Sequence, residues 1–269
     1  MMRRSLRRVR RQLRYLAGYF NFAPDAGPAR LADFGKAERP VLLLYGFFST
    51  RRTFEVLERR LRRDGYCVFS INLGGLRRTF NTRGIDDLAD FVRAKVERIY
   101  GRHPGLGPLT IIGHSKGGLI GAYYVKKLGG WRRTRALITL GTPHNGTPTA
   151  YAGIPLGVFA RSIWQMTPMS GLIQRLQEGA WPPHVRLVSV YSRHDRVSPY
   201  PSALLDPHGL PYISNVEVPD ASHRDFLHKK RVYDIVLAQL RAAEATRPVE
   251  KAGLTLVPGA APQGNALAG

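Results

Sequence analysis

Short apolar runs alternate with amphipathic stretches through the middle of the chain. The apolar runs read as buried strands and lie at residues 41–45, 66–72, 109–113, 136–140, 185–191 and 213–218. The amphipathic stretches repeat apolar residues every three or four positions, as helices with one buried face do. They lie at residues 51–62, 85–100, 116–128 and 224–242, with Thr50 as a candidate cap for the first. This alternation predicts an α/β fold with a parallel, doubly wound sheet, whose chemistry gathers at the carboxyl ends of the strands.

One segment interrupts the alternation. Residues 147–183 contain proline, glycine and aromatic residues, with a helical pattern over residues 163–176. The segment follows the strand at residues 136–140, on the edge where we expect the active site. We therefore interpret it as a cap or lid over that site.

Composition is compatible with one large domain. The chain has 269 residues, of which 43% are hydrophobic, enough to form a full α/β core. A single cysteine, Cys67, excludes an internal disulfide, and its apolar surroundings predict a buried, unreactive thiol. The net charge of +22 makes nucleic acid an obvious partner to consider. Because the sequence has no zinc-finger spacing, aromatic RNA-binding signature or helix-turn-helix pattern, we expect no nucleic-acid partner.

Positive charge is concentrated in a basic, amphipathic segment at residues 1–30. An apolar stripe recurs there at helical spacing, formed by Leu6, Val9, Leu13, Leu16 and Phe20. The segment could anchor the protein to an anionic membrane surface, or it could be a helix packed on its own domain or a frayed basic tail. No uninterrupted apolar run follows the basic residues, so we expect no secretion signal and a cytoplasmic protein, with peripheral attachment to the inner membrane face as an option. The α/β domain is expected at residues 31–246, and the Ala-, Gly- and Pro-rich residues 247–269 are expected to be disordered.

The stretch Gly113-His114-Ser115-Lys116-Gly117 lies between a predicted strand and a predicted helix. A sharp strand-to-helix turn of this kind exposes a serine hydroxyl, and only very small residues fit at the flanking positions. Ser115 is therefore the candidate nucleophile. We expect the side chain of His114 to point away at the turn and that of Lys116 to reach solvent.

A serine nucleophile requires a general base and an acid that orients the base. His223 follows the last predicted strand and is the preferred base among eight histidines. Asp195 follows the strand at residues 185–191 and is the preferred acid. Asp220 is the main rival, but it lies only three residues before His223 and so cannot approach from a different strand.

Two backbone N–H groups are candidates for an oxyanion hole, the pair of donors that stabilises a developing negative charge on oxygen. One belongs to Lys116 and the other to Phe47, in the loop after the first strand. Phe48 and His144 are candidate substrate-binding residues. No cofactor motif or metal-ligand spacing is evident, so we expect neither a cofactor nor a metal.

These segments together resemble the α/β-hydrolases of the bacterial lipase and esterase type, including triacylglycerol lipases. The matching segments are residues 41–47, 113–118, 140–147, 195–199 and 222–223, and residues 164–171 resemble the lid region. The resemblance implies cleavage of carboxylic, lipid-like acyl esters through an acyl-enzyme, with Ser115, Asp195 and His223 as the triad. The chain has Tyr45-Gly46 where that family usually has His-Gly. Acyl transfer or thioester cleavage with the same triad, and a non-catalytic member that binds a membrane or a partner, are the alternatives.

Overall fold

A computed structural model describes residues 39–47, 49, 51–73, 83–153 and 161–245. Several expectations from the sequence fall outside these residues. They are the basic segment, the tail, the cap at Thr50 and the substrate contact of Phe48.

All six strands of the central sheet are parallel, in the order β2-β1-β3-β4-β5-β6. Their bounds are β1 Pro40–Leu44, β2 Cys67–Ser70, β3 Leu109–His114, β4 Thr134–Leu140, β5 Arg186–Tyr191 and β6 Ile213–Glu217. Strand β1 pairs with both β2 and β3, so the chain runs outward to one edge and then returns to build the other. The predicted parallel, doubly wound sheet is confirmed. Strands β1 and β3 are buried along their whole length, as expected of strands covered on both faces.

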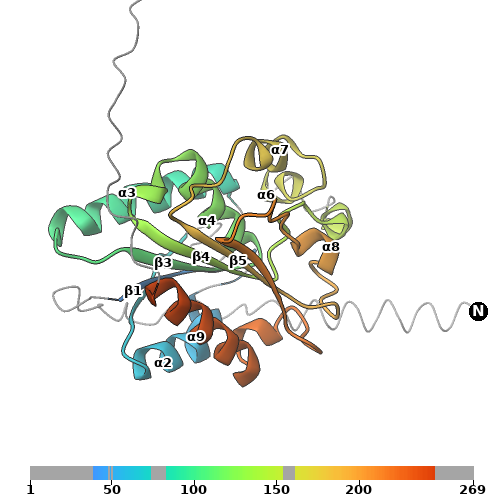
Figure 1. The fold of residues 1–269 in the computed structure, drawn as a ribbon. Helices are drawn as coiled ribbons and strands as arrows, with labels where there is room; N and C mark the ends of the chain where they lie inside the picture. Colours follow the sequence, from blue (N-terminus) through green and yellow to red (C-terminus); the bar gives the residue numbers. More distant parts are fainter. Residues whose placement is uncertain (1–38, 48, 50, 74–82, 154–160, 246–269) are drawn as a thin grey trace, which may run out of the picture.

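Helices cover both faces of the sheet (Figure 1). Helices α3 (Ile85–Arg102) and α4 (Lys116–Lys127) pack together on one face, and α2 (Glu55–Arg63) and α9 (Lys230–Ala245) lie beside each other on the opposite face. The prediction for residues 51–62 is modified at its start, because a 3-10 turn, η2 (Arg51–Phe54), precedes α2. The last helix begins later than predicted: η5 (Asp225–Leu227) comes first, and α9 starts at Lys230.

The segment at residues 147–183 contains η4 (Pro148–Gly153), α6 (Arg161–Gln165) and α7 (Gly171–Gln177). The single helical pattern predicted over residues 163–176 is divided into two helices, because Met169 has a positive φ of 59° and Ser170 caps α7 through its side chain. Helix α6 packs at the start of α3, where Gln165 Oε1 accepts a hydrogen bond from the Ile85 N–H at 2.6 Å. The cap or lid function of this segment stays a prediction.

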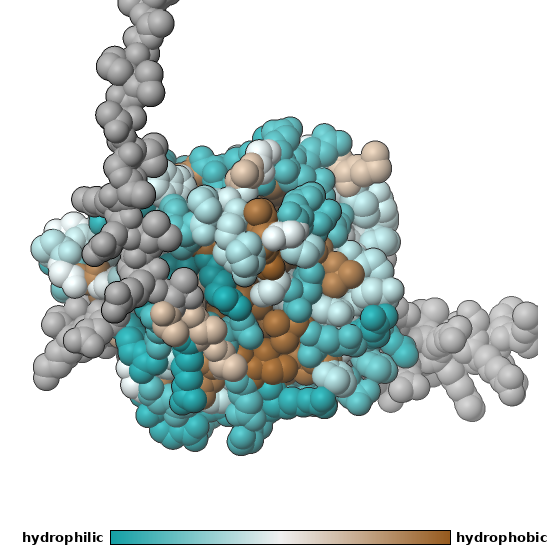
Figure 2. Space-filling model, in the orientation of Figure 1, coloured by the Kyte–Doolittle hydropathy of each residue, from teal (hydrophilic) through white to brown (hydrophobic). Residues whose placement is uncertain are grey.

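Apolar residues on the face shown in Figure 2 gather centrally, between the helices at its top and bottom, and hydrophilic residues surround them. Helix α8 (Tyr200–Ala203) flanks β5 near this region. In the described part of the chain no helix combines the length and the apolar character needed to cross a membrane.

Candidate active site

Ser115 occupies a strained turn between β3 and α4. Its φ of 54° and ψ of −127° are unfavourable for a residue with a side chain. Its backbone is held on both sides: the Ser115 N–H donates to the Leu140 carbonyl at 2.9 Å, and the Ser115 carbonyl accepts from Thr142 Oγ1 at 2.9 Å. This turn places the serine side chain at the carboxyl edge of the sheet, as the sequence predicts.

Glycines around the turn allow α4 to cross the strands at very short range. A Cβ atom on Gly117 would lie 1.9 Å from the Leu44 carbonyl oxygen, and one on Gly113 would lie 2.5 Å from the Gly118 Cα. A Cβ on Gly46 would lie 2.9 Å from the Ser115 Cβ. The loop after β1 is therefore packed directly against the candidate nucleophile.

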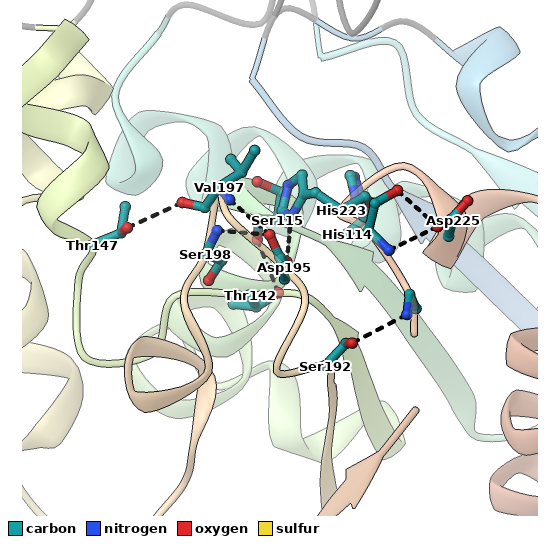
Figure 3. Close-up of polar contacts among 12 residues, drawn as sticks. His114, Ser115, Thr142, Thr147, Ser192, Asp195, Val197, Ser198, His223 and Asp225 are labelled. Atoms are coloured by element: carbon teal, nitrogen blue, oxygen red, sulfur yellow. Dashed lines mark hydrogen bonds and ion pairs between the residues drawn. The ribbon is translucent and has the colours of Figure 1, made fainter. Parts of the chain in front are cut away.

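Asp195 and His223 form a buried hydrogen-bonded pair next to Ser115 (Figure 3). The distance between His223 Nδ1 and Asp195 Oδ2 is 2.6 Å, and both side chains are almost completely excluded from solvent. Asp195 Oδ1 accepts from the N–H groups of Val197 and Ser198 at 2.8 and 2.9 Å. An acceptor-only carboxylate oxygen requires the proton to be on Nδ1, so Nε2 is the basic nitrogen of a neutral His223.

The loop that carries His223 is fixed by the polar side chains of Asp225 and Ser192. Asp225 Oδ2 accepts from the N–H and the hydroxyl of Ser222 at 2.7 and 2.8 Å. Ser192 Oγ accepts from the Ala221 N–H at 3.2 Å, and also from an N–H in the loop of Asp195. These contacts tie the acid-bearing loop and the base-bearing loop to each other.

His114 packs against His223, in contrast to the expectation that its side chain points away. The two ring centroids are 4.6 Å apart, and His114 Nε2 donates to the His223 carbonyl at 3.0 Å. Burial, with the nearby His223 ring as a second cause, lowers the pKa of His114 well below its usual range, so this ring is neutral at pH 7. The side chain points inward because the last residue of β3 is fully buried under the loop of the candidate base.

Gly141 lies against the Asp195–His223 hydrogen bond. A Cβ at this position would be 2.8 Å from Asp195 Oδ2 and 3.1 Å from His223 Nδ1, and the backbone has a positive φ of 53°. Further along the same segment, the Thr147 hydroxyl donates to the Val197 carbonyl at 3.1 Å. The Gly-Thr-Pro-His-Asn-Gly-Thr stretch therefore contacts both members of the pair or their loops.

The side chain of Lys116 is completely buried, and the expectation that it reaches solvent is wrong. Its Nζ donates to the Arg83 carbonyl at 2.6 Å and lies 5.6 Å from the centre of the Phe47 ring. Burial is the main reason that the pKa of Lys116 is well below its usual range, and the charge of Arg83 lowers it further. Since α4 passes so close to the strands, the long side chain extends between the loop after β1 and the start of α3.

The remaining candidates are placed as follows. Asp220 is exposed and lies 3.5 Å from His194, so it takes no part in the buried pair. His144 Nε2 bonds the Thr139 hydroxyl at 2.9 Å, and burial lowers its pKa to about 4. It lines a cavity of about 630 Å³ between α4, α7 and residues 204–213, in which none of Ser115, Asp195 and His223 takes part. Its role in substrate binding stays a prediction.

The structure has a six-stranded parallel sheet, a strained serine after β3, and a buried Asp–His pair after β5 and β6. In the comparison with known proteins, a family model described as the alpha/beta hydrolase fold matches residues 39–156. The chain has the α/β-hydrolase fold.

Solved structures support this assignment. The mature form of the lipase BlEst2 from Bacillus licheniformis is similar with a TM-score of 0.62 and 16% identity, covering 80% of this chain and 96% of that one. A carboxylesterase of Nitrososphaera gargenis gives a TM-score of 0.60 and 16% identity, covering 77% and 92% of the two chains. Lipase B from Aspergillus fumigatus gives 0.62 and 16%, covering 81% and 59%. No curated protein sequence matches the chain. Identities this low establish the α/β-hydrolase fold alone.

Some residues of this α/β-hydrolase-fold site could not be found from the sequence. Ser192 and Asp225 hold the loops of the pair, and neither belongs to a motif with a chemical signature. Gly141 belongs to the segment at residues 140–147 that resembles lipases. Its contact with Asp195 and His223, however, depends on how β4 and β5 lie next to each other in the sheet. Among the described residues, no group of three or more His, Cys, Asp or Glu side chains is arranged to hold a metal ion.

Proposed function

We propose that this protein is a serine hydrolase that cleaves carboxylic esters through an acyl-enzyme on Ser115. His223 is the general base and general acid, and Asp195 orients its ring. The observation that carries this proposal is the buried 2.6 Å hydrogen bond between Asp195 and His223, formed beside a serine in a strained turn. Burying a carboxylate and straining a serine both cost free energy, and such costs are typical of active sites.

The reaction proceeds in two balanced halves. Ser115 Oγ attacks the ester carbonyl carbon, and its proton passes to His223 Nε2. When the tetrahedral intermediate collapses, the bond to the alcohol oxygen breaks and His223 gives that oxygen the proton. A water molecule then attacks the acyl-enzyme, giving its proton to His223, which returns it to Ser115 as the carboxylic acid leaves.

The oxyanion is stabilised by the backbone N–H groups of Lys116 and Phe47. Lys116 begins α4, whose N-terminus has a partial positive charge, and the Phe47 loop is held close to Ser115 by the short contact at Gly46. The buried Lys116 amine supports this geometry, since its side chain contacts the Phe47 ring on one side and the Arg83 carbonyl on the other.

The distribution of exposed hydrophobic side chains favours a substrate with an apolar acyl group. The large hydrophobic side chains that are exposed among the described residues all belong to the segment at residues 147–183: Tyr151 at 51%, Trp164 at 48% and Met169 at 79%. Single exposed apolar residues are common on protein surfaces, so it is the location of all three in the segment interpreted as a lid that supports lipid-like acyl esters as substrates.

The experiment is hydrolysis of p-nitrophenyl esters of increasing acyl length by wild type and Ser115→Ala. We expect kcat to fall by about 10⁴-fold or more in the variant, because the acyl-enzyme cannot form. A fluorophosphonate should add covalently to the wild type and not to Ser115→Ala, as measured by intact mass. Including thioesters, and alcohols as competing acyl acceptors, separates hydrolysis of oxygen esters from thioester cleavage and acyl transfer.

The matched control is Ser214→Ala, which removes a hydroxyl from β6, three strands away from β3 in the sheet. It should keep its activity and its covalent labelling. Full activity in Ser115→Ala would refute the mechanism. Absence of both turnover and labelling in wild type would favour a non-catalytic, binding member of the fold.

A further inference from the structure

A small cationic pocket lies beside the candidate active site. It has a volume of about 190 Å³ and lies between η2, the start of α2 and η5. We call it the arginine pocket, and the described residues that line it are Ser49, Arg52, Thr53, Val56, Arg224, Leu227 and His228. Cavities that enclose whole drug-sized ligands are typically about 300–1,000 Å³, so this one suits a single small group.

Both walls of the arginine pocket are connected to the catalytic residues. On one wall, the Ser49 hydroxyl donates to the Phe47 carbonyl at 3.4 Å, and Phe47 adjoins Gly46, which packs on Ser115. On the other wall, Arg224 directly follows His223 in the sequence. The two walls are thus linked to the loop that packs on Ser115 and to the residue after His223.

The charge in this pocket is positive. Arg52 and Arg224 are exposed to solvent, and Arg52 forms no ion pair with any described residue. None of the described residues that line the pocket is acidic. Asp225 lies 3.3 Å from His228 of the lining and 3.1 Å from Lys229, and it accepts two hydrogen bonds from Ser222. Its charge is therefore already engaged.

Guanidinium groups bind phosphate through paired N–H donors, and serine and threonine hydroxyls add further donors. Two arginines around a small volume match a tetrahedral dianion better than a single carboxylate. We propose that the arginine pocket binds a phosphate group on the alcohol part of the substrate, so that the preferred substrates are acyl esters of phosphorylated alcohols. This inference rests on the proposed ester hydrolysis at Ser115.

The test compares two short-chain esters that stay monomeric in solution, 1-butyrylglycerol 3-phosphate and 1-butyrylglycerol. The readout is the ratio of their kcat/KM values in wild type, Arg52→Gln, Arg224→Gln and the double variant. We expect wild type to prefer the phosphate ester by at least about tenfold, which corresponds to about 1.4 kcal/mol. The ratio should fall toward one in the double variant. It should be higher in Arg52→Lys than in Arg52→Gln, because lysine keeps the charge but not the paired donors.

Arg59→Gln is the matched control, because Arg59 is an exposed arginine on α2 that does not line the pocket. It should leave the ratio at the wild-type value, which separates the pocket from the general positive charge of the protein. An equal ratio in wild type and the double variant, or no wild-type preference, would overturn the inference while leaving ester hydrolysis intact.

A binding measurement keeps the inference testable if no ester is turned over. Glycerol 3-phosphate should bind Ser115→Ala in calorimetry, glycerol should not, and the Arg52→Gln/Arg224→Gln variant should lose the binding by at least about tenfold. Inorganic phosphate should compete with the phosphate ester. If it binds without competing, the pocket holds a free anion rather than the substrate, and the inference is wrong.

Discussion

Gly141→Ala gives a sharp test of the site, because this glycine touches the Asp195–His223 hydrogen bond directly. The added Cβ would lie 2.8 Å from Asp195 Oδ2, 3.1 Å from His223 Nδ1 and 2.9 Å from a ring carbon of Phe226. These three contacts are all shorter than an ordinary van der Waals contact of about 3.5 Å. The neighbours must therefore move.

The size of that movement follows from the distances. Restoring a contact of about 3.5 Å from 2.8 Å displaces the carboxylate oxygen by about 0.7 Å. Catalytic groups tolerate displacements of about 0.5 Å, and an error of 1 Å can cost about 100-fold in rate. The backbone adds about 1–2 kcal/mol of strain at a φ of 53°, and overpacking adds about 1–3 kcal/mol. We expect kcat to fall by about 100-fold and the free energy of unfolding by about 2–5 kcal/mol.

Gly65→Ala is the matched control, because Gly65 also has a positive φ, of 85°, but a Cβ there would meet nothing within 4 Å. It should lose only the backbone cost, about 1–2 kcal/mol, and keep its kcat. Ester hydrolysis at a temperature where both variants are folded, together with urea unfolding, measures both quantities. Equal kcat in Gly141→Ala and wild type would refute the view that the close contact with the pair matters for catalysis.

Two further predictions concern the same site. Asp195→Asn should lower kcat by about 10⁴-fold, because an amide no longer fixes the His223 tautomer. The amide can still accept from the Val197 N–H, so circular dichroism should show that the fold is retained. A loss of kcat below tenfold would count against the triad. Lys116→Met should change the pH dependence of stability. The folded-state pKa of Lys116 is lowered, so in the window between that pKa and about 10.4 the unfolded state holds the extra proton, and wild-type stability rises with pH by up to about 1.4 kcal/mol per unit. Urea unfolding between pH 7 and 10 should show this slope in wild type and not in Lys116→Met, and parallel curves would contradict a buried amine.

The core strands could be predicted because a buried parallel strand is apolar along its length. Residues 109–113, for example, correspond to β3, which is buried throughout. The helix predicted over residues 163–176 was less accurate. Periodicity shows which face is apolar. It does not show that Met169 adopts a positive φ, which ends the first helix, or that a new helix begins after Ser170.

At the site, residue type and order in the sequence were enough to nominate Ser115, Asp195 and His223, because a nucleophile, an acid and a base must each follow a strand of such a sheet. Asp195 is buried against His223, whereas Asp220 is exposed beside His194, and the roles of both residues stay predictions. The side-chain directions of His114 and Lys116 were predicted wrongly. A local pattern contains no information about which distant loop covers a position.

Hydrophobic periodicity and residue type along the chain thus predict the fold class, the strands and the candidate chemical groups. The contacts that tune those groups follow from packing in three dimensions: the burial of Lys116 against Arg83, the packing of His114 on His223, and the close approach of Gly141 to the Asp195–His223 pair. Each of these contacts joins segments far apart in the chain. Their geometry is set by how the strands and helices pack, which no single segment encodes.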